Sequence, residues 1–104
     1  MITSPDKPKV KQARALLDAK GRREQGRCLI EGVRLIEEAL RAGVSPALVF
    51  FVDQAQQSPR SAALLAAARA EGAALLEVSP AVFGTLSDTV ASQGVIAVAP
   101  IPRV

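Results

Sequence analysis

The segment over residues 27–40, RCLIEGVRLIEEAL, predicts a short strand, a glycine turn and an amphipathic helix. Residues 28–30 form an apolar run that is too short for a helix and is bounded by charged side chains. Gly32 allows the backbone to change direction without the steric cost of a Cβ atom. The apolar residues that follow recur at spacings of three and four, as on one face of a helix: Val33, Ile36 and Leu40.

The rest of the chain alternates between helical and strand patterns. A helix is predicted from Pro8 to about Gly21, followed by a loop over residues 21–26. Two further helices start at Pro59 and Pro80, each after a serine suited to be an N-cap. The remaining apolar runs, over residues 47–52, 73–78 and 95–99, read as strands. This alternation predicts an α/β fold, a three-layer α/β/α sandwich with a mostly parallel four-stranded sheet.

Composition narrows the possible chemistry. The 104 residues are 49% hydrophobic, enough for one domain with its own core. A single cysteine and the lack of histidine exclude an internal disulfide and an imidazole base, and no metal-ligand spacing or phosphate-binding loop is present. We therefore expect no catalytic, metal or cofactor site in this chain alone. No run is long enough to span a membrane and no signal peptide is recognisable, so the expected location is cytoplasmic.

Positive charge is concentrated at one end of the chain. Residues 1–27 carry a net charge of +5, whereas residues 28–104 carry −2. Such asymmetry points to an anionic partner, and the low aromatic content of 3% argues against recognition by base stacking. The sequence thus predicts binding to the backbone and shape of a structured RNA. The candidate phosphate contacts are Lys9, Lys11, Lys20, Arg22, Arg23, Arg27 and Arg34.

Two short motifs stand apart from this charge pattern, one at residues 31–32 and one at residue 93. Glu31 and Gly32 are expected to shape the turn from strand to helix. For Gln93 two roles remain open, a hydrogen bond to a base or ribose and a structural role in a turn.

These motifs, taken with their spacing, resemble a known family. Arg23, residues 28–32 (CLIEG), residues 38–40, Gly43 and residues 93–98 (QGVIAV) are similar to the N-terminal substrate-binding domain of SpoU-type (TrmH-like) RNA 2′-O-ribose methyltransferases. The resemblance implies a fold like that of kink-turn-binding ribosomal proteins. It also implies a parent enzyme that uses S-adenosylmethionine to methylate ribosomal or transfer RNA, and that forms a homodimer through a catalytic domain following in the same chain.

The resemblance assigns this chain the RNA-recognition role. We expect one domain over residues 1–104, with a flexible tail at 1–5 and the start of a linker to a missing catalytic domain at 100–104. Cys28 stands where the family more often has a bulky aromatic residue. Two alternatives remain: a freestanding kink-turn-type RNA-binding protein, although the Asn-Glu pair typical of that class is absent, and a structural or dimerisation module.

Overall fold

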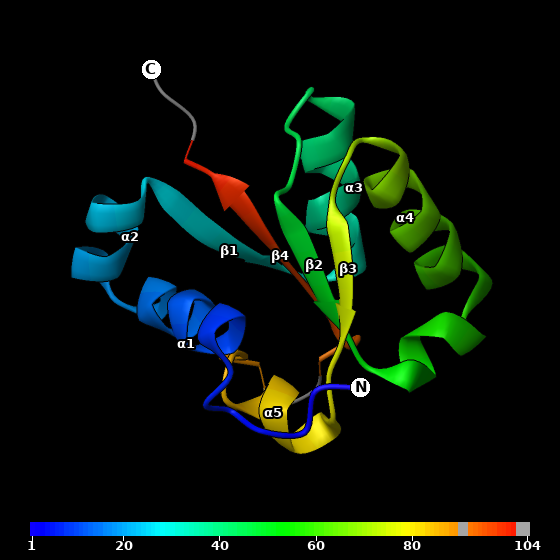
Figure 1. Cartoon of the computed structure of the whole chain (residues 1–104). Coiled ribbons are helices and arrows are strands. Elements are labelled where there is room, and N and C mark those ends of the chain that lie inside the picture. The colour runs from blue at the N-terminus through cyan, green and yellow to red at the C-terminus, as the bar shows by residue number, and fades with distance from the viewer. Residues whose placement is uncertain (90–91, 102–104) are drawn as a thin grey trace.

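Four strands form one mixed sheet at the centre of the molecule (Figure 1). In the computed structural model, which describes residues 1–89 and 92–101, the strands lie in the order β1-β4-β2-β3. Their bounds are β1 Arg27–Glu31, β2 Leu48–Phe51, β3 Ala74–Glu77 and β4 Val95–Pro100. The predicted strands are therefore all present.

The direction of β4 corrects the prediction of a mostly parallel sheet. This strand is antiparallel to both of its neighbours, β1 and β2, and the one parallel pair of the described sheet joins β2 to β3. Its run of buried apolar residues suits a central strand of either direction, so composition could not reveal the direction. The cause lies in the preceding connection: Val52 N at the end of β2 donates to Gly94 O at 3.1 Å, so β4 starts where β2 finishes.

Helices cover both faces of the sheet, which confirms the three predicted layers (Figure 1). One face packs against α1 (Pro8–Arg14), the 3-10 helix η1 (Ala15–Leu17) and α5 (Pro80–Gly84). The other packs against α3 (Val33–Arg41) and α4 (Pro59–Ala70), with a 3-10 helix η2 (Asp53–Gln57) before α4. Two separate apolar cores result. The largest fully buried side chains include Leu16, Phe50 and Ile96 on the first face and Val33, Ile36 and Val49 on the second.

The segment over residues 27–40 has the predicted structure. β1 ends at Glu31, and Gly32 adopts a φ of 100°, which favours glycine, before α3 begins at Val33. The serine caps are confirmed as well: Ser58 Oγ accepts from Ser61 N at 3.5 Å, and Ser79 Oγ accepts from Val82 N at 3.2 Å. Local patterning was sufficient at these places because each signal and its partner lie within one turn.

A separate helix, α2 (Ala19–Gln25), replaces the loop predicted over residues 21–26. Asp18 is its N-cap, with Oδ1 accepting from Gly21 N at 2.8 Å. Gly21 does not end a helix; it is buried within α2, where a Cβ atom would lie 1.8 Å from the carbonyl oxygen of Ala15. The glycine is needed because α2 packs directly on the backbone of η1.

The first residues are fixed to the sheet, in place of the expected flexible tail over residues 1–5. Ile2 forms a parallel bridge with Val78, in which Ile2 N donates to Glu77 O at 2.8 Å and Ser79 N donates to Ile2 O at 2.8 Å. The side chain of Ile2 also packs against the first core. At the other end of the chain, Pro100 belongs to β4 and not to a linker, and residues 102–104 lie outside the described residues.

An ion pair joins the two helices of the second face. Arg60 Nη2 on α4 lies 2.7 Å from Glu37 Oε1 on α3, and a second hydrogen bond links Arg60 Nε to Glu37 Oε2 at 3.2 Å. The hydrogen bonds from Arg60 lower the pKa of Glu37 below its usual value. A carboxylate with a lowered pKa stabilises the folded state above its unfolded pKa, and this contribution is lost as the pH falls through the folded pKa.

Replacing Glu37 by Gln removes this ion pair and should therefore destabilise the protein at pH 7. The loss should be small, because the bidentate pair is exposed to solvent. The difference between the variant and the wild type should shrink as the pH falls through the lowered pKa of Glu37, since the wild-type carboxylate then becomes protonated. Urea unfolding at a series of pH values from 7 downward measures this. Equal stability at pH 7, or a difference that does not shrink on acidification, would contradict the assignment.

Replacing Gly21 by Ala should lower the free energy of unfolding by about 1–3 kcal/mol, because the added methyl group must displace the Ala15 carbonyl. Gly84 is a matched control: it also lies in a helix, but a Cβ atom there would meet nothing within 4 Å. We expect Gly84→Ala to change the free energy by less than about 1 kcal/mol. Urea midpoints of the two variants test the packing of α2; a neutral Gly21→Ala would contradict it.

Candidate functional site

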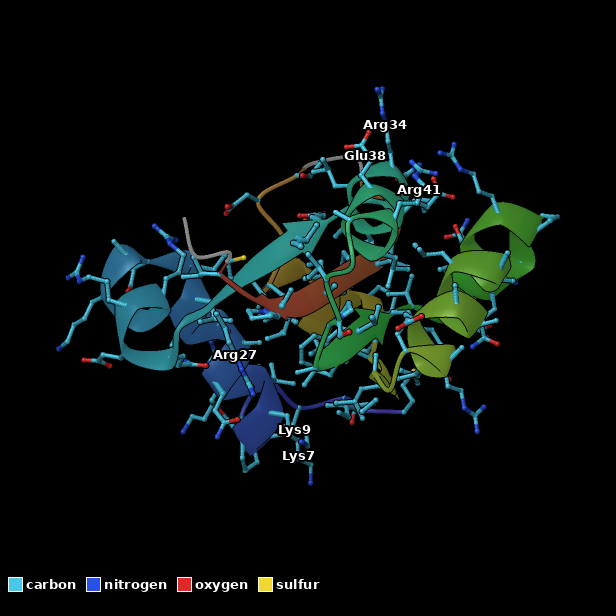
Figure 2. All side chains as sticks on the ribbon, turned by 90° about the horizontal axis from the view of Figure 1, so that it is seen from above. Lys7, Lys9, Arg27, Arg34, Glu38 and Arg41 are labelled. Carbon is cyan, nitrogen blue, oxygen red and sulfur yellow. The ribbon has the colours of Figure 1, made fainter. Side chains whose placement is uncertain are left out.

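Most of the predicted cations lie on α1, α2 and the start of β1. We call this surface the basic end. It comprises Lys7, which is the N-cap of α1, together with Lys9, Lys11, Lys20, Arg22, Arg23 and Arg27. Figure 2 shows the side chains, with Lys7, Lys9 and Arg27 labelled. All of them except Arg22 are exposed. The end is cationic because α2, absent from the prediction, carries three of these residues.

Contacts between α1 and α2 hold the basic end together. Gln25 Nε2 at the end of α2 donates to the carbonyl oxygen of Gln12 on α1 at 2.9 Å. Gln12, Gln25 and Arg27 line a shallow hollow of ≈ 380 Å³. Lys9 lies three residues before Gln12 and so on the same stripe of α1. Lys9 and Arg27 therefore border one surface, whereas Lys11, two residues from Lys9, projects from the opposite flank of α1.

Two arginines of the basic segment are engaged within the fold. Arg22 Nη1 donates to Leu16 O at 3.1 Å, and Arg14 Nη1 donates to Pro5 O at 3.1 Å, with both residues half-buried. Arg22 thus joins α2 to the end of η1. Among the other predicted contacts, Lys20 Nζ lies 3.9 Å from Glu24 Oε1 on the exposed face of α2. A solvent-exposed ion pair of this length is weak, so the ammonium group of Lys20 remains available to another anion.

Arg34 is separated from the basic end. It lies on the first turn of α3, beyond the far end of β1 from Arg27, and the five residues of β1 span about 13 Å. Figure 2 shows Arg34 away from Lys7, Lys9 and Arg27. Its Nε donates to Glu38 Oε1 at 3.3 Å, and its side chain is 82% exposed. The structure therefore divides the predicted contacts into two groups.

The two sequence motifs meet at the end of the sheet next to Arg34. Val33 N, the first amide of α3, donates to Gln93 Oε1 at 2.8 Å, although the residues are 60 positions apart. Ser87 Oγ donates to Glu31 Oε2 at 2.6 Å, and Gly32 N donates to Val95 O at 3.1 Å. We call this group, Glu31, Gly32, Val33, Ser87 and Gln93, the motif edge. Gln93 Oε1 thus has a structural role at the start of α3, where it accepts from the first amide of the helix.

Two hollows with both polar and apolar lining lie beside the motif edge. One of ≈ 300 Å³ is lined in part by Ser58, Ser61 and Gln93, and one of ≈ 360 Å³ in part by Ser87 and Thr89. Both share Val52, Gln54, Ser92 and Gly94. Hydroxyl and amide groups of this kind donate to and accept from sugar, phosphate and base atoms alike. No periodicity or spacing in the sequence indicated these hollows.

Neither a metal site nor a membrane segment is found in the described part of the chain. Within residues 1–89 and 92–101, no three His, Cys, Asp or Glu side chains are grouped so that they could hold an ion. Among the same residues, no helix has the length and apolar character needed to cross a bilayer.

Comparison with known proteins assigns the fold and both motifs to one family. The model of the MRM3-like substrate binding domain matches residues 7–97, nearly the whole chain. This chain belongs to that family. The match confirms the resemblance to the substrate-binding domain of SpoU-type RNA methyltransferases, and the matched range includes both the basic end and the motif edge.

Solved structures agree with the family. A crystal structure of an RNA 2′-O ribose methyltransferase is 39% identical, with a TM-score of 0.83 over 97% of this domain. An rRNA methyltransferase from Sinorhizobium meliloti is 28% identical over 95%, with a TM-score of 0.79. The SpoU methyltransferase AviRb from Streptomyces viridochromogenes, in complex with AdoMet, is 25% identical over 93%, also with a TM-score of 0.79.

A curated relative matches a shorter stretch. An uncharacterized tRNA/rRNA methyltransferase of Synechocystis sp. is 52% identical over 42 residues, which are 40% of this chain and 15% of that protein. The MRM3-like domain described here also spans only 36–37% of the three solved methyltransferase chains.

Replacing Gln93 by Ala should destabilise the domain by about 1 kcal/mol, because Val33 N at the start of α3 loses its acceptor. Gln93→Glu keeps a side-chain acceptor and places negative charge at a helix N-terminus, so it should remain within about 0.5 kcal/mol of the wild type. Gln56→Ala, at an exposed glutamine of η2, is the control. Urea unfolding of the three variants distinguishes capping from a general effect of losing glutamine; equal losses in all three would contradict it.

Proposed function

We propose that this chain is the RNA-recognition domain of an S-adenosylmethionine-dependent RNA 2′-O-ribose methyltransferase of the SpoU family. The observation that carries the proposal is the family match over residues 7–97, which includes all seven predicted phosphate contacts. Its substrate would be a structured ribosomal or transfer RNA, delivered to a catalytic domain in the same polypeptide. The parent enzyme would act as a homodimer.

The exposed cations of the basic end suit an RNA backbone. Lys9, Arg23 and Arg27 are exposed and no ion pair is described for them, so their charges are available to phosphates. Arginine presents a planar fork of donors that matches two phosphate oxygens at once. With only three phenylalanines in the chain, backbone contacts rather than base stacking would supply the affinity.

The motif edge would add a second point of contact. Arg34 offers charge there, and the hydroxyl and amide groups around the two hollows offer hydrogen bonds at the same end of the sheet. Two contacts at opposite ends of β1 would fix the orientation of an RNA as well as hold it. Each contact alone would tolerate many orientations.

Methyl transfer itself would take place outside this domain. S-adenosylmethionine supplies the methyl group in the proposed reaction, and AviRb was crystallised with AdoMet. The two hollows are lined by Ser, Thr and Gln side chains together with apolar ones, and Asp53, in the second hollow, is the one titratable residue of either lining, so no paired titratable groups converge there. We assign no residue of this chain to the cofactor, and its own contribution is to bind and orient the RNA.

Replacing Arg23 and Arg27 together by Ala should weaken binding to a structured RNA by roughly 10- to 30-fold at 0.15 M salt, if each residue contacts one phosphate. The magnitude of the slope of log affinity against log salt concentration should fall by about 1.4–1.8. Anisotropy titrations with a labelled RNA fragment between 50 and 200 mM salt measure both quantities.

The matched control is Arg41→Ala with Arg69→Ala, which removes the same charge from α3 and α4 on the second face. If only net charge mattered, both double variants would lose affinity equally, and this result would contradict the basic end as the interface. Arg34→Ala tests the second contact separately. Arg22 is left unchanged because it hydrogen-bonds Leu16 O.

A further inference from the structure

An apolar groove runs along β1 on the face of the sheet that carries α3. It has a volume of ≈ 460 Å³. Its lining consists of Cys28, Leu29, Ile30 and Glu31 from β1, Leu35, Glu38 and Ala39 from α3, and Val44 and Pro100. Cys28 and Ile30 are half-buried, and Leu35 is 55% exposed, although each is apolar. The domain therefore leaves part of one sheet face without a covering layer.

The backbone along this groove is also unpaired. Among the described residues, no strand lies beyond β1. Gly32 N donates to Val95 O and Ile101 N donates to Gly26 O, so alternate residues of β1 bond to β4 and the others point away from it. Leu29 is one of the residues whose N–H and C=O point outward. Exposed strand edges beside apolar surface attract other polypeptide segments.

RNA is a poor occupant for this groove. Its lining includes two carboxylates, Glu31 and Glu38, which Ser87 Oγ and Arg34 Nε already contact, and the other lining side chains are apolar. A polyanion would find no cation among the lining residues and few donors to replace its water. The basic end and the motif edge, by contrast, offer charge and hydrogen bonds. The groove calls for a protein partner with apolar side chains.

The path of the chain indicates which protein segment lies nearby. β4 ends at Pro100, which lines the groove, and Ile101 N is held by Gly26 O at 3.0 Å beside the start of β1. By the alternation of a strand, Ile101 lies on the same face as Cys28, and it is 39% exposed. A polypeptide that continues past this point therefore leaves directly next to the groove. The methyltransferase that is 39% identical has such a longer chain, since this domain covers 37% of its length.

We propose that the groove along β1 and α3 is the docking surface for the polypeptide that follows this domain in the parent methyltransferase. This inference rests on the proposed function, in which a catalytic domain continues the same chain. Apolar residues of that following segment cover Cys28, Ile30 and Leu35 and complete the second core. The contact fixes the orientation of the RNA-binding surfaces relative to the active site.

The thiol of Cys28 reports on the groove, because this chain contains a single cysteine. Alkylation of Cys28 by iodoacetamide, followed on its own peptide by mass spectrometry, is compared in the 104-residue chain and in the polypeptide encoded by the complete reading frame. We expect the rate in the longer chain to be at least about tenfold lower, because the following segment blocks access to the thiol.

Two matched variants of the longer chain test the surface. Leu35→Glu places a charge in the groove and should restore the alkylation rate to within about threefold of the 104-residue chain. Leu17→Glu makes the same change at a leucine of η1 that is 38% exposed on the other face, and should leave Cys28 protected. Far-UV circular dichroism confirms that both variants are folded.

Three results would overturn the proposal: equal alkylation rates in the two chains, protection that Leu35→Glu leaves unchanged, or a reading frame that ends at residue 104. Protection that appears in the 104-residue chain as its concentration rises would instead assign the groove to a second copy. RNA titrations of the same samples separate this test from the proposed function, since Leu35→Glu should leave the RNA affinity of the basic end intact.

Discussion

The insertion of β4 between β1 and β2 is the constraint on which the rest of the structure depends. β4 is the last strand in sequence, yet it lies at the centre of the sheet with Val95 to Ala99 buried. Until it is in place, β1 has no strand partner in the described sheet. The sheet, both cores and the position of the basic segment therefore become fixed together, late in the chain, through contacts between residues about 70 positions apart.

The same insertion assembles the motif edge. Because β4 starts where β1 and β2 end, Gln93 is brought against the first turn of α3 and accepts from Val33 N. Ser87, on the connection that leads into β4, reaches Glu31 at the end of β1. The spacing of the two motifs in the sequence is thus the length of chain needed to form α3, β2, η2, α4, β3 and α5 before returning to the same place. Their pairing is a consequence of topology.

Local signals predicted much of the fold, and contacts distant in sequence account for what they missed. The strand, turn and helix over residues 27–40 and the caps at Ser58 and Ser79 follow from side chains within one turn of one another. The direction of β4 does not, because a buried apolar strand has the same composition in either direction. Asp18, the N-cap three residues before the buried Gly21, is the local signal for α2.

In the candidate site, too, local sequence signals predicted some features, and contacts in three dimensions account for the others. Charge asymmetry in the sequence indicated the basic segment, but it placed Arg27 and Arg34 in one set of phosphate contacts. The extended backbone of β1 carries them to opposite ends of a strand, whereas helical spacing would have kept them within about two turns. The internal hydrogen bond of Arg22 also has no signature in composition, since it depends on where η1 presents its free carbonyl.

β1 thus joins three surfaces of different chemistry. Its start carries the cations of the basic end, its finish carries the motif edge, and its outer side borders an apolar groove rimmed by carboxylates. A polyanion and an apolar polypeptide segment can occupy these surfaces at the same time because neither competes for the chemistry that the other needs. A single five-residue strand is therefore enough to relate the position of a bound RNA to that of a domain docked beside it.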